Sequence, residues 1–443
     1  MTTPPEQPTT TTDDQLEPDV LRPKGFEFGA VPTRPGEHLF VGIAPPPLGP
    51  LENFTGTFIG NGFNTIFRPQ NPATPTFPSP PFPPQLQDSD NVLELNLTSE
   101  TLSFSTSLAG NSVGVPNRGE VQGDIFLNGV PYLQVINDIT NAPNNPVGIH
   151  FEPGLWVIVP TTTDPAEPGL PPGVAGPPQQ TLVRMASIPH GTTINAQGTF
   201  SSASGPPTIP AVSITPFKTG SPSDLITFPS QTATTGGTAR IPQDLTSFIA
   251  AGTITQQLLD DPNTLLRDVV AKQSGPNTPQ TIVSTTTISI STNPATPLFG
   301  GGADNIAFLL ADPSALTIAH EQQEGLISAP PPGPGPNAQA LSMQATFWIE
   351  TVESKIVVPP LSAGETVIIA AEPPLPGLPA PRFQVKPPIN ITQPRTITVS
   401  STQIQYSQAV FLVFGRVGSL TWPHVSVNTL VPFDPIVVPA SAF

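Results

Sequence analysis

Proline is the feature that most limits what this chain can fold into. It makes up 64 of the 443 residues, about three times its usual share in proteins. Each proline removes a backbone N–H from any helix or sheet ladder, so long helices are disfavoured. Hydrophobic residues still account for 37% of the chain, with 24 phenylalanines, which is enough apolar surface for a core. We therefore predict a folded, β-rich body with long proline-rich loops.

The charge balance excludes several classes of partner. Only 11% of the residues are charged, the net charge is −17, and the 15 basic residues are scattered. Binding to nucleic acid requires clustered Lys and Arg, and so does binding to an anionic membrane surface. The N-terminus has no basic and apolar regions of a secretory signal, and no apolar run reaches transmembrane length. We predict no nucleic-acid partner, no membrane insertion and a cytoplasmic location, with homo-oligomerisation left open.

Short alternating segments bounded by turn residues run through most of the chain. Examples are residues 53–60, 92–97, 181–187 and 396–407, and this pattern is typical of an all-β sandwich or barrel. Asn128 and Gly129 lie between two apolar segments and predict a hairpin turn. One helical region is expected between residues 242 and 272, where Asn263 would be the N-cap of a short helix.

Histidine is rare, with five residues in the chain. His424 begins an alternating apolar and polar segment near the chain end, and imidazole is the commonest metal ligand in proteins. His150 and Glu152 share one face of a predicted strand, either as a hydrogen-bonded pair that fixes strand register or as a metal or acid–base pair. His190 follows a proline and precedes a glycine, which indicates a turn residue or a pocket-rim residue. The chain has no cysteine, so thiolate ligands and disulfides are excluded.

Three segments, in this order, resemble one protein family. Residues 56–62 read G-T-F-I-G-N-G and resemble the G-x-W-x-G-x-G opening strand of the nitrobindin-like haem-binding β-barrels, with Phe58 in place of the tryptophan. Residues 149–156 read I-H-F-E-P-G-L-W and are similar to the family's central H-x-E-x-G-x-W strand. Val157 stands where the family usually has an arginine after that tryptophan. Residues 396–430 resemble the family's closing hairpin and final strand, whose histidine matches His424.

The resemblance implies an antiparallel up-and-down β-barrel of the lipocalin or fatty-acid-binding-protein kind. In it, Gly56, Gly60 and Gly62 would let the opening strand bend at a barrel corner. The expected organisation has a large mixed insertion and proline-rich loops. Residues 1–50 would be a proline- and threonine-rich tail, 51–200 the first part of the barrel, 201–395 an insertion with short helices and extra strands, and 396–443 the closing barrel strands and C-terminal tail.

The resemblance also implies a cofactor, haem b, with His424 as the axial ligand of its iron. The other residues expected to contact the cofactor are Trp422, Phe58, His150, Trp156 and His190. Ferric haem in such a barrel would bind nitric oxide or isomerise peroxynitrite, so any enzymatic activity would be a haem-dependent isomerase or peroxidase-like one. Two alternatives remain: a non-haem carrier of a hydrophobic small molecule, and a structural or assembly protein, which the Pro/Thr/Asn-rich, charge-poor composition would suit.

Overall fold

The computed structural model describes most of the chain beyond the N-terminal tail. The described residues are 46–68, 70–71, 74–75, 91–110, 114–117, 125–141, 144–159, 181–275, 278–293, 302–305, 338–414 and 420–443. Residues 1–45 of the predicted tail lie outside this set. All the residues predicted to contact a cofactor lie within it.

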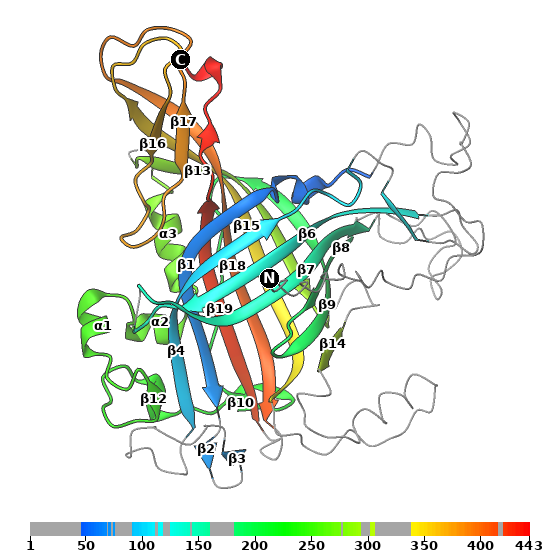
Figure 1. Ribbon diagram of the computed structural model, residues 1–443. Helices are drawn as coiled ribbons and strands as arrows, with labels where there is room; N and C mark the ends of the chain where they lie inside the picture. Colours follow the sequence, from blue (N-terminus) through cyan, green and yellow to red (C-terminus); the bar gives the residue numbers. More distant parts are fainter. Residues whose placement is uncertain are drawn as a thin grey trace, which may run out of the picture. The chain divides into compact units, whose positions relative to one another are not determined.

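The core of the structure is a closed antiparallel β-barrel of ten strands (Figure 1). Each ring strand pairs with the next ring strand along the chain, and β1 pairs with β19 to close the ring. The predicted up-and-down barrel is therefore confirmed. The ring strands are β1 (Gly56–Arg68), β4 (Val92–Phe104), β6 (Ile125–Asp138), β7 (Val147–Val159), β8 (Thr181–Ser187), β9 (Thr192–Ser204), β13 (Gln280–Ser291), β15 (Ala338–Val358), β18 (Arg395–Phe414) and β19 (Leu420–Pro432).

Shorter strands lie outside the ring. A separate three-stranded sheet, in the order β16–β17–β20, covers the extended ends of β15 and β18. Its strands are β16 (Val367–Ala370), β17 (Arg382–Val385) and β20 (Ile436–Val437). The other short strands are β2 (Gln70–Asn71), β3 (Thr74–Pro75), β5 (Val115–Asn117), β10 (Phe217–Lys218), β11 (Ser221–Leu225), β12 (Arg240–Ile241) and β14 (Gly302–Asn305).

Two ring strands, β13 and β15, come from the region that the sequence assigned to an insertion, residues 201–395. The segment between β9 and β13 does lie outside the ring, and it carries the expected short helices α1 (Thr246–Ala251), α2 (Gln256–Asp260) and α3 (Thr264–Lys272). Asn263 is the N-cap residue of α3, but its side chain does not cap the helix and donates to the carbonyl of Pro210 instead.

The barrel strands bury side chains on both faces. Strand residues alternate between the two faces, and the inward set forms one apolar cluster that includes Phe58, Trp156 and Tyr406. The outward residues of β1, β4, β18 and β19 form a second cluster with the helical segment, which includes Val425 and Val427. Figure 1 shows the helices α1 and α2 beside β4. A helical cover on one side explains why β19 is apolar on both faces along part of its length.

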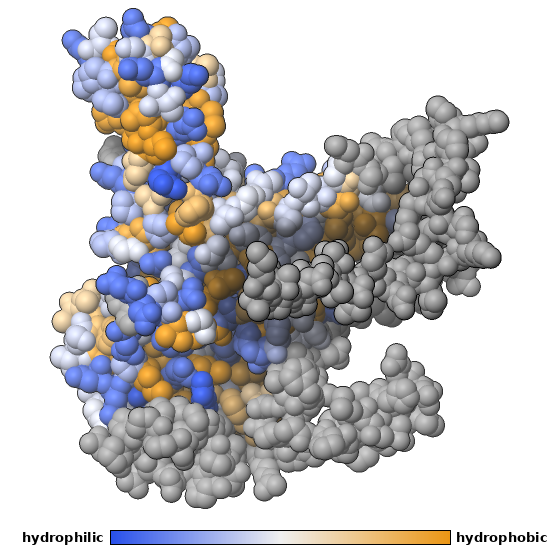
Figure 2. Space-filling model, viewed as in Figure 1, coloured by the Kyte–Doolittle hydropathy of each residue, from blue (hydrophilic) through white to orange (hydrophobic). Residues whose placement is uncertain are grey.

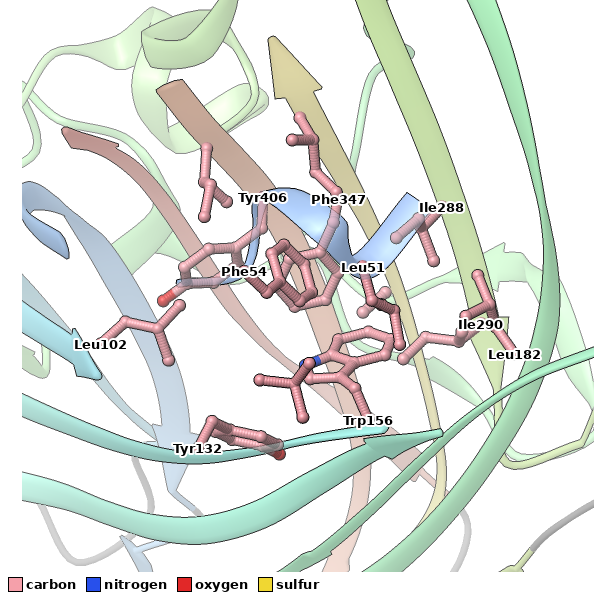
Figure 3. Packing of buried hydrophobic residues seen from close by; sticks show 14 of the residues in the cluster. Leu51, Phe54, Leu102, Tyr132, Trp156, Leu182, Ile288, Ile290, Phe347 and Tyr406 are labelled. Carbon is pink, nitrogen blue, oxygen red and sulfur yellow. The ribbon is translucent and has the colours of Figure 1, made fainter. Parts of the chain in front are cut away.

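One end of the barrel is filled by the turn that precedes β1. This 3-10 helix, η1 (Gly49–Asn53), places Leu51 and the following Phe54 among the inward side chains (Figure 3). Phe54 stacks on Phe104 with ring centroids 4.5 Å apart and meets Trp156 edge-on at 5.6 Å. Burying two large apolar side chains there contributes about 1.5–3 kcal/mol each. The residues just before β1 therefore belong to the barrel core.

The closure of β1 on β19 depends on two inward-facing glycines, Gly60 and Gly62. A Cβ atom on Gly62 would overlap the backbone carbonyl oxygen of Val427, and one on Gly60 would overlap that of Thr429. The two strands approach so closely that only glycine fits on the inner face of β1 at these positions. We call this contact the β1–β19 seam. Gly60 and Gly62 are needed for this close approach, whereas a Cβ at Gly56 would meet nothing within 4 Å.

The hairpin predicted at Asn128 and Gly129 is wrong, because β6 runs through both residues. The Asn128 side chain instead accepts hydrogen bonds from the backbone N–H groups of Ala109 and Gly129 and donates to the carbonyl of Pro46. Gly129 is needed in mid-strand, since a Cβ there would overlap the carbonyl oxygen of Trp156. Gly129 therefore allows a close contact between β6 and β7, and Asn128 anchors the backbone at Pro46.

Orange and blue residues are interspersed over the described face shown in Figure 2. None of the described helices is long and apolar enough to cross a membrane.

The seam makes a prediction about stability. Gly62→Ala should lower the free energy of unfolding by about 1–3 kcal/mol, because the added methyl group forces β1 away from β19. Gly236→Ala is the matched control, since a Cβ at Gly236 meets nothing within 4 Å. Urea denaturation of both variants measures the difference. Equal stability of the two variants would contradict the close approach at the seam.

Candidate functional site

Three of the predicted site histidines lie toward the same end of the barrel. His150 is on β7 and His190 is in the turn between β8 and β9, and their rings meet edge-on with centroids 5.0 Å apart. His424 on β19 is close enough to both for their charges to act on it. The chain therefore brings together imidazoles that lie 40 and 234 residues apart in sequence (190 − 150 and 424 − 190).

His424 is a neutral imidazole at physiological pH. Burial is the main cause that lowers its pKa, and His150, His190 and Arg68 add electrostatic repulsion, which together bring the pKa to about 4. Burial, followed by the charge of His150, also lowers the pKa of His190. A neutral imidazole keeps the nitrogen lone pair that a metal ion needs. The environment thus holds His424 in its ligand-competent form.

The Asn64 amide holds the His424 ring in place. Its Nδ2 lies 2.7 Å from His424 Nε2 and donates to Ser426 Oγ at 2.7 Å. Asn96 on the neighbouring strand donates to Asn64 Oδ1 at 3.3 Å. With Asn64 as donor, Nε2 is the acceptor and Nδ1 carries the ring proton. A row of amides across β4, β1 and β19 therefore sets the tautomer of His424.

The apolar residues beside His424 and His150 come from adjacent strands. Val425 and Val427 lie on the other face of β19 and pack outside the barrel. Val410 is the cross-strand partner of His424 on β18 and packs against the interior cluster. Ile136, which is buried, is the cross-strand partner of His150. Aliphatic side chains from β6 and β18 therefore stand next to the histidines.

A buried ion pair crosses the interior next to the histidines. Arg184 on β8 donates to Glu152 at 2.6 Å and, through Nε, to Tyr132 at 2.7 Å, while Tyr132 donates to Glu152. Burial raises the pKa of the Glu152 carboxyl, but Arg184 and the hydrogen bond from His150 bring it down to about 2. His150 Nε2 lies 3.1 Å from the other oxygen of Glu152. Glu152 thus stays charged and orients His150.

Arg184 is the functional residue that the sequence reasoning missed. It is the cross-strand partner of Trp156, and its guanidinium carbon lies 5.6 Å from the Trp156 ring and 5.3 Å from the Phe347 ring. The arginine expected after Trp156 along the chain is absent, and one from the adjacent strand is placed against that tryptophan instead. Its only signal in the sequence is a single cation inside an apolar strand segment.

Glu100 anchors a second buried polar group in the same interior. Its carboxylate accepts hydrogen bonds from Tyr406, from Gln134 at 2.7 Å and from Asn428 at 2.8 Å. Burial raises the pKa of Glu100, and these three donors oppose that rise. The donors come from β18, β6 and β19, so this carboxylate ties together strands that are far apart in sequence. Glu100 lies beyond the segment 92–97 that the sequence marks as a strand, and the sequence cannot show its partners.

Each inward-facing residue of the H-x-E-x-G-x-W segment has its own role. His150 and Glu152 form the pair described above, and Trp156 packs in the apolar end of the barrel. Gly154 has no side chain because a Cβ there would overlap the ring of Tyr132, its cross-strand partner. That room lets Tyr132 reach both Glu152 and Arg184. The motif is thus a unit that builds the polar interior.

The remaining predicted contact residues, Phe58 and Trp422, pack in the two apolar clusters. Phe58 is in the interior cluster, with its ring centroid 6.0 Å from that of Phe104. Trp422 belongs to the cluster outside the barrel, where it stacks on Phe228 at 5.7 Å. The structure therefore gathers His150, His190 and His424, places Phe58 and Trp156 in the apolar interior, and leaves Trp422 on the outer cover.

A metal site made wholly of protein ligands is not found among the described residues. No group of three or more His, Asp, Glu or Cys side chains lies close enough there to hold an ion. A cofactor that brings its own ligands to the metal needs one imidazole, which His424 can provide.

Comparison with known proteins adds little to this picture. No protein-family model matches the chain, and no curated protein sequence does. Among solved structures, the crystal structure of Rv2717c from M. tuberculosis aligns with a TM-score of 0.28 and 8% sequence identity, covering 88% of this chain and 99% of that one. A likeness at this level supports no conclusion about fold or function.

Replacing the buried cation should destabilise the protein strongly. Arg184→Met leaves Glu152 charged and unpaired in the interior, which we expect to lower the free energy of unfolding by about 3–5 kcal/mol. The double variant Arg184→Met/Glu152→Gln removes both charges and should recover much of that loss. Guanidinium denaturation compares the three proteins. A double variant no more stable than the single one would show that the ion pair is not the source of the effect.

His424 should make stability depend on pH in a defined window. Its pKa is about 4 in the folded chain against 6.5 for the ordinary imidazole, so as pH falls the unfolded chain takes up the proton first. The free energy of unfolding therefore decreases from about pH 6.5 down to about pH 4. Urea denaturation at about pH 7.5 and about pH 5 should show a larger loss for the wild type than for His424→Gln. An equal loss in both would rule out this contribution.

Proposed function

We propose that the protein is a haem-binding β-barrel in which His424 binds the haem iron. The observation that carries the proposal is the position of His424: a neutral imidazole near two other histidines at one end of a closed barrel. The resemblance of three ordered segments to the nitrobindin-like family supports the same choice. Imidazole is a common axial ligand of haem iron.

The surroundings of His424 are compatible with this role. The aliphatic side chains of Val410 and Ile136 offer apolar contacts beside the histidines. Coordination through Nε2 would replace a single hydrogen bond, the one from Asn64, and the same amide nitrogen would keep its bond to Ser426. Arg68, which forms an ion pair with Glu94 at 2.8 Å, lies close enough to act on His424 electrostatically. The imidazole of His424 and the apolar side chains beside it therefore both suit haem.

Bound ferric haem would supply an iron centre that binds nitric oxide or isomerises peroxynitrite. The chain's own contribution is to orient groups around it. Glu152 holds His150 through Nε2, which leaves Nδ1 as the nitrogen that can exchange a proton or hydrogen-bond to a small oxidant. Arg184 keeps Glu152 charged and so keeps His150 in position. An enzymatic role would be that of a haem-dependent isomerase or a peroxidase-like enzyme.

The same proposal includes a cytoplasmic setting, a small-molecule ligand as the main partner and no binding of nucleic acid. The sparse, scattered basic residues and the net charge of −17 support the last point.

Haemin titration tests the proposal. Apo protein should take up haemin with a shifted Soret band, and His424→Gln should weaken binding at least about tenfold, because the axial ligand contributes more than about 1.4 kcal/mol. His38→Gln is the matched control, since His38 belongs to the N-terminal tail and is not among the predicted cofactor contacts, and it should keep the band. In His424→Gly, added imidazole should restore the band by filling the vacated ligand position.

Three outcomes would overturn the proposal. The wild type could fail to take up haemin, or His424→Gln could bind it as well as the wild type does. If apo protein takes up no haemin but retains a lipid in native mass spectrometry, a carrier of hydrophobic molecules is the better description. A single large assembly without any ligand would favour the structural role.

A further inference from the structure

A second site is present on the outside of the barrel. A groove of about 590 Å³ lies over the outward faces of β9, β13, β15 and β18, next to the covering segment that contains residues 210–212 and Asn263. Its volume falls within the range of small-molecule sites. The groove is distinct from the histidine end, because its floor is made of the side chains that point away from the interior.

The floor of the groove is a regular array of hydroxyl and amide side chains. Four hydroxyl residues are paired across four adjacent strands and so form one continuous row: Thr199, Ser289, Thr346 and Ser407. The neighbouring row contains Gln197, Ser291 and Gln344 in the same cross-strand register. Neighbouring side chains within a row are separated by the distance between strands, about 4.8 Å. This spacing is close to the length of one sugar ring.

Six of these seven side chains are not used inside the protein, and the seventh, Ser291, accepts a hydrogen bond from the backbone N–H of Asn293. None of the four hydroxyl side chains makes a hydrogen bond to another side chain or to the backbone within the described residues, and neither do the amides of Gln197 and Gln344. Asn263, at the wall of the groove, is 2% exposed, and its Oδ1 has no partner in the described part of the chain. A buried amide oxygen without a partner lowers stability, and a hydrogen bond from a ligand hydroxyl would satisfy it.

The groove has no ionisable side chain among the described residues that line it. A charged ligand would therefore find no counter-charge, although the chain as a whole carries a net charge of −17. Hydroxyl and amide groups both donate and accept hydrogen bonds, so they match a ligand whose hydroxyls do the same. Trp348, Ala409 and Val212 add an apolar part to the lining, which suits the C–H faces of sugar rings.

We propose that this groove binds a neutral oligosaccharide. The hydroxyl row on β9, β13, β15 and β18 contacts the sugar hydroxyls. Gln197 and Gln344, on the adjacent row, contact further hydroxyls of the same ligand. Asn263 accepts a hydrogen bond from the ligand through Oδ1. The site is independent of haem binding, because outward and inward residues alternate on the same strands. On β15, Thr346 faces the groove and Phe347 faces the barrel interior.

Isothermal titration with four neutral oligosaccharides tests the proposal: maltohexaose, cellohexaose, xylohexaose and chitohexaose. At least one should bind the full-length protein with a Kd on the order of 0.1–1 mM. Thr346→Val removes one hydroxyl without changing the side-chain shape, and Gln344→Ala removes an exposed amide. Each variant should weaken binding at least about tenfold. Thr398→Val is the matched control, because Thr398 is an exposed threonine of β18 outside the groove.

The result that overturns the proposal is an absence of binding by all four sugars to the wild type. Equal binding by wild type and both groove variants would overturn it as well, since the sugar would then sit elsewhere. A change in oligomeric state in Thr346→Val or Gln344→Ala would instead assign the groove to contact between protein copies. Circular dichroism checks that each variant is folded. Haemin uptake equal to that of the wild type is a second check of folding.

Discussion

The contact on which the rest of the structure depends is the closure of β1 on β19. It joins the first and last strands of the ring, and it exists because Gly60 and Gly62 remove every side-chain atom that would hold the strands apart. Closure gives the barrel a sealed inner face without free edges along the ring. It also positions the candidate ligand, because Asn64, on the same face of β1 as Gly62, bonds to His424 on β19. The β1–β19 seam therefore both closes the barrel and positions His424.

The interior that this closure creates is unusually polar at its centre. Two carboxylates, Glu100 and Glu152, are buried with their donors, and Arg184 is the cation that compensates one of them. Charges in such a place are tolerated only when they are paired and hydrogen-bonded. The donors come from β6, β8, β18 and β19, so the network specifies which strands must meet. It also holds His150 through Glu152, which links the stability of the barrel to the arrangement of the histidines.

The sequence predicts the barrel because its signals are local: alternating strands, glycines on an opening strand and a histidine on a closing one. It does not predict which strands of residues 201–395 join the ring, since pairing of β13 and β15 with β9 and β18 depends on contacts between distant residues. Arg184 was missed for the same reason, because its partner Glu152 lies on another strand.

The two proposed sites use opposite faces of the same strands, and this makes them separable. A substitution at Thr346 changes the outer groove, whereas one at Phe347 changes the interior packing, although the two residues are neighbours. Since each site takes its side chains from one face of these strands, binding on one side need not displace the side chains on the other. The exception is the seam, where β19 carries His424 inward and Val425 outward against the helical cover. Movement of that cover is therefore a route by which events outside the barrel can reach the histidine.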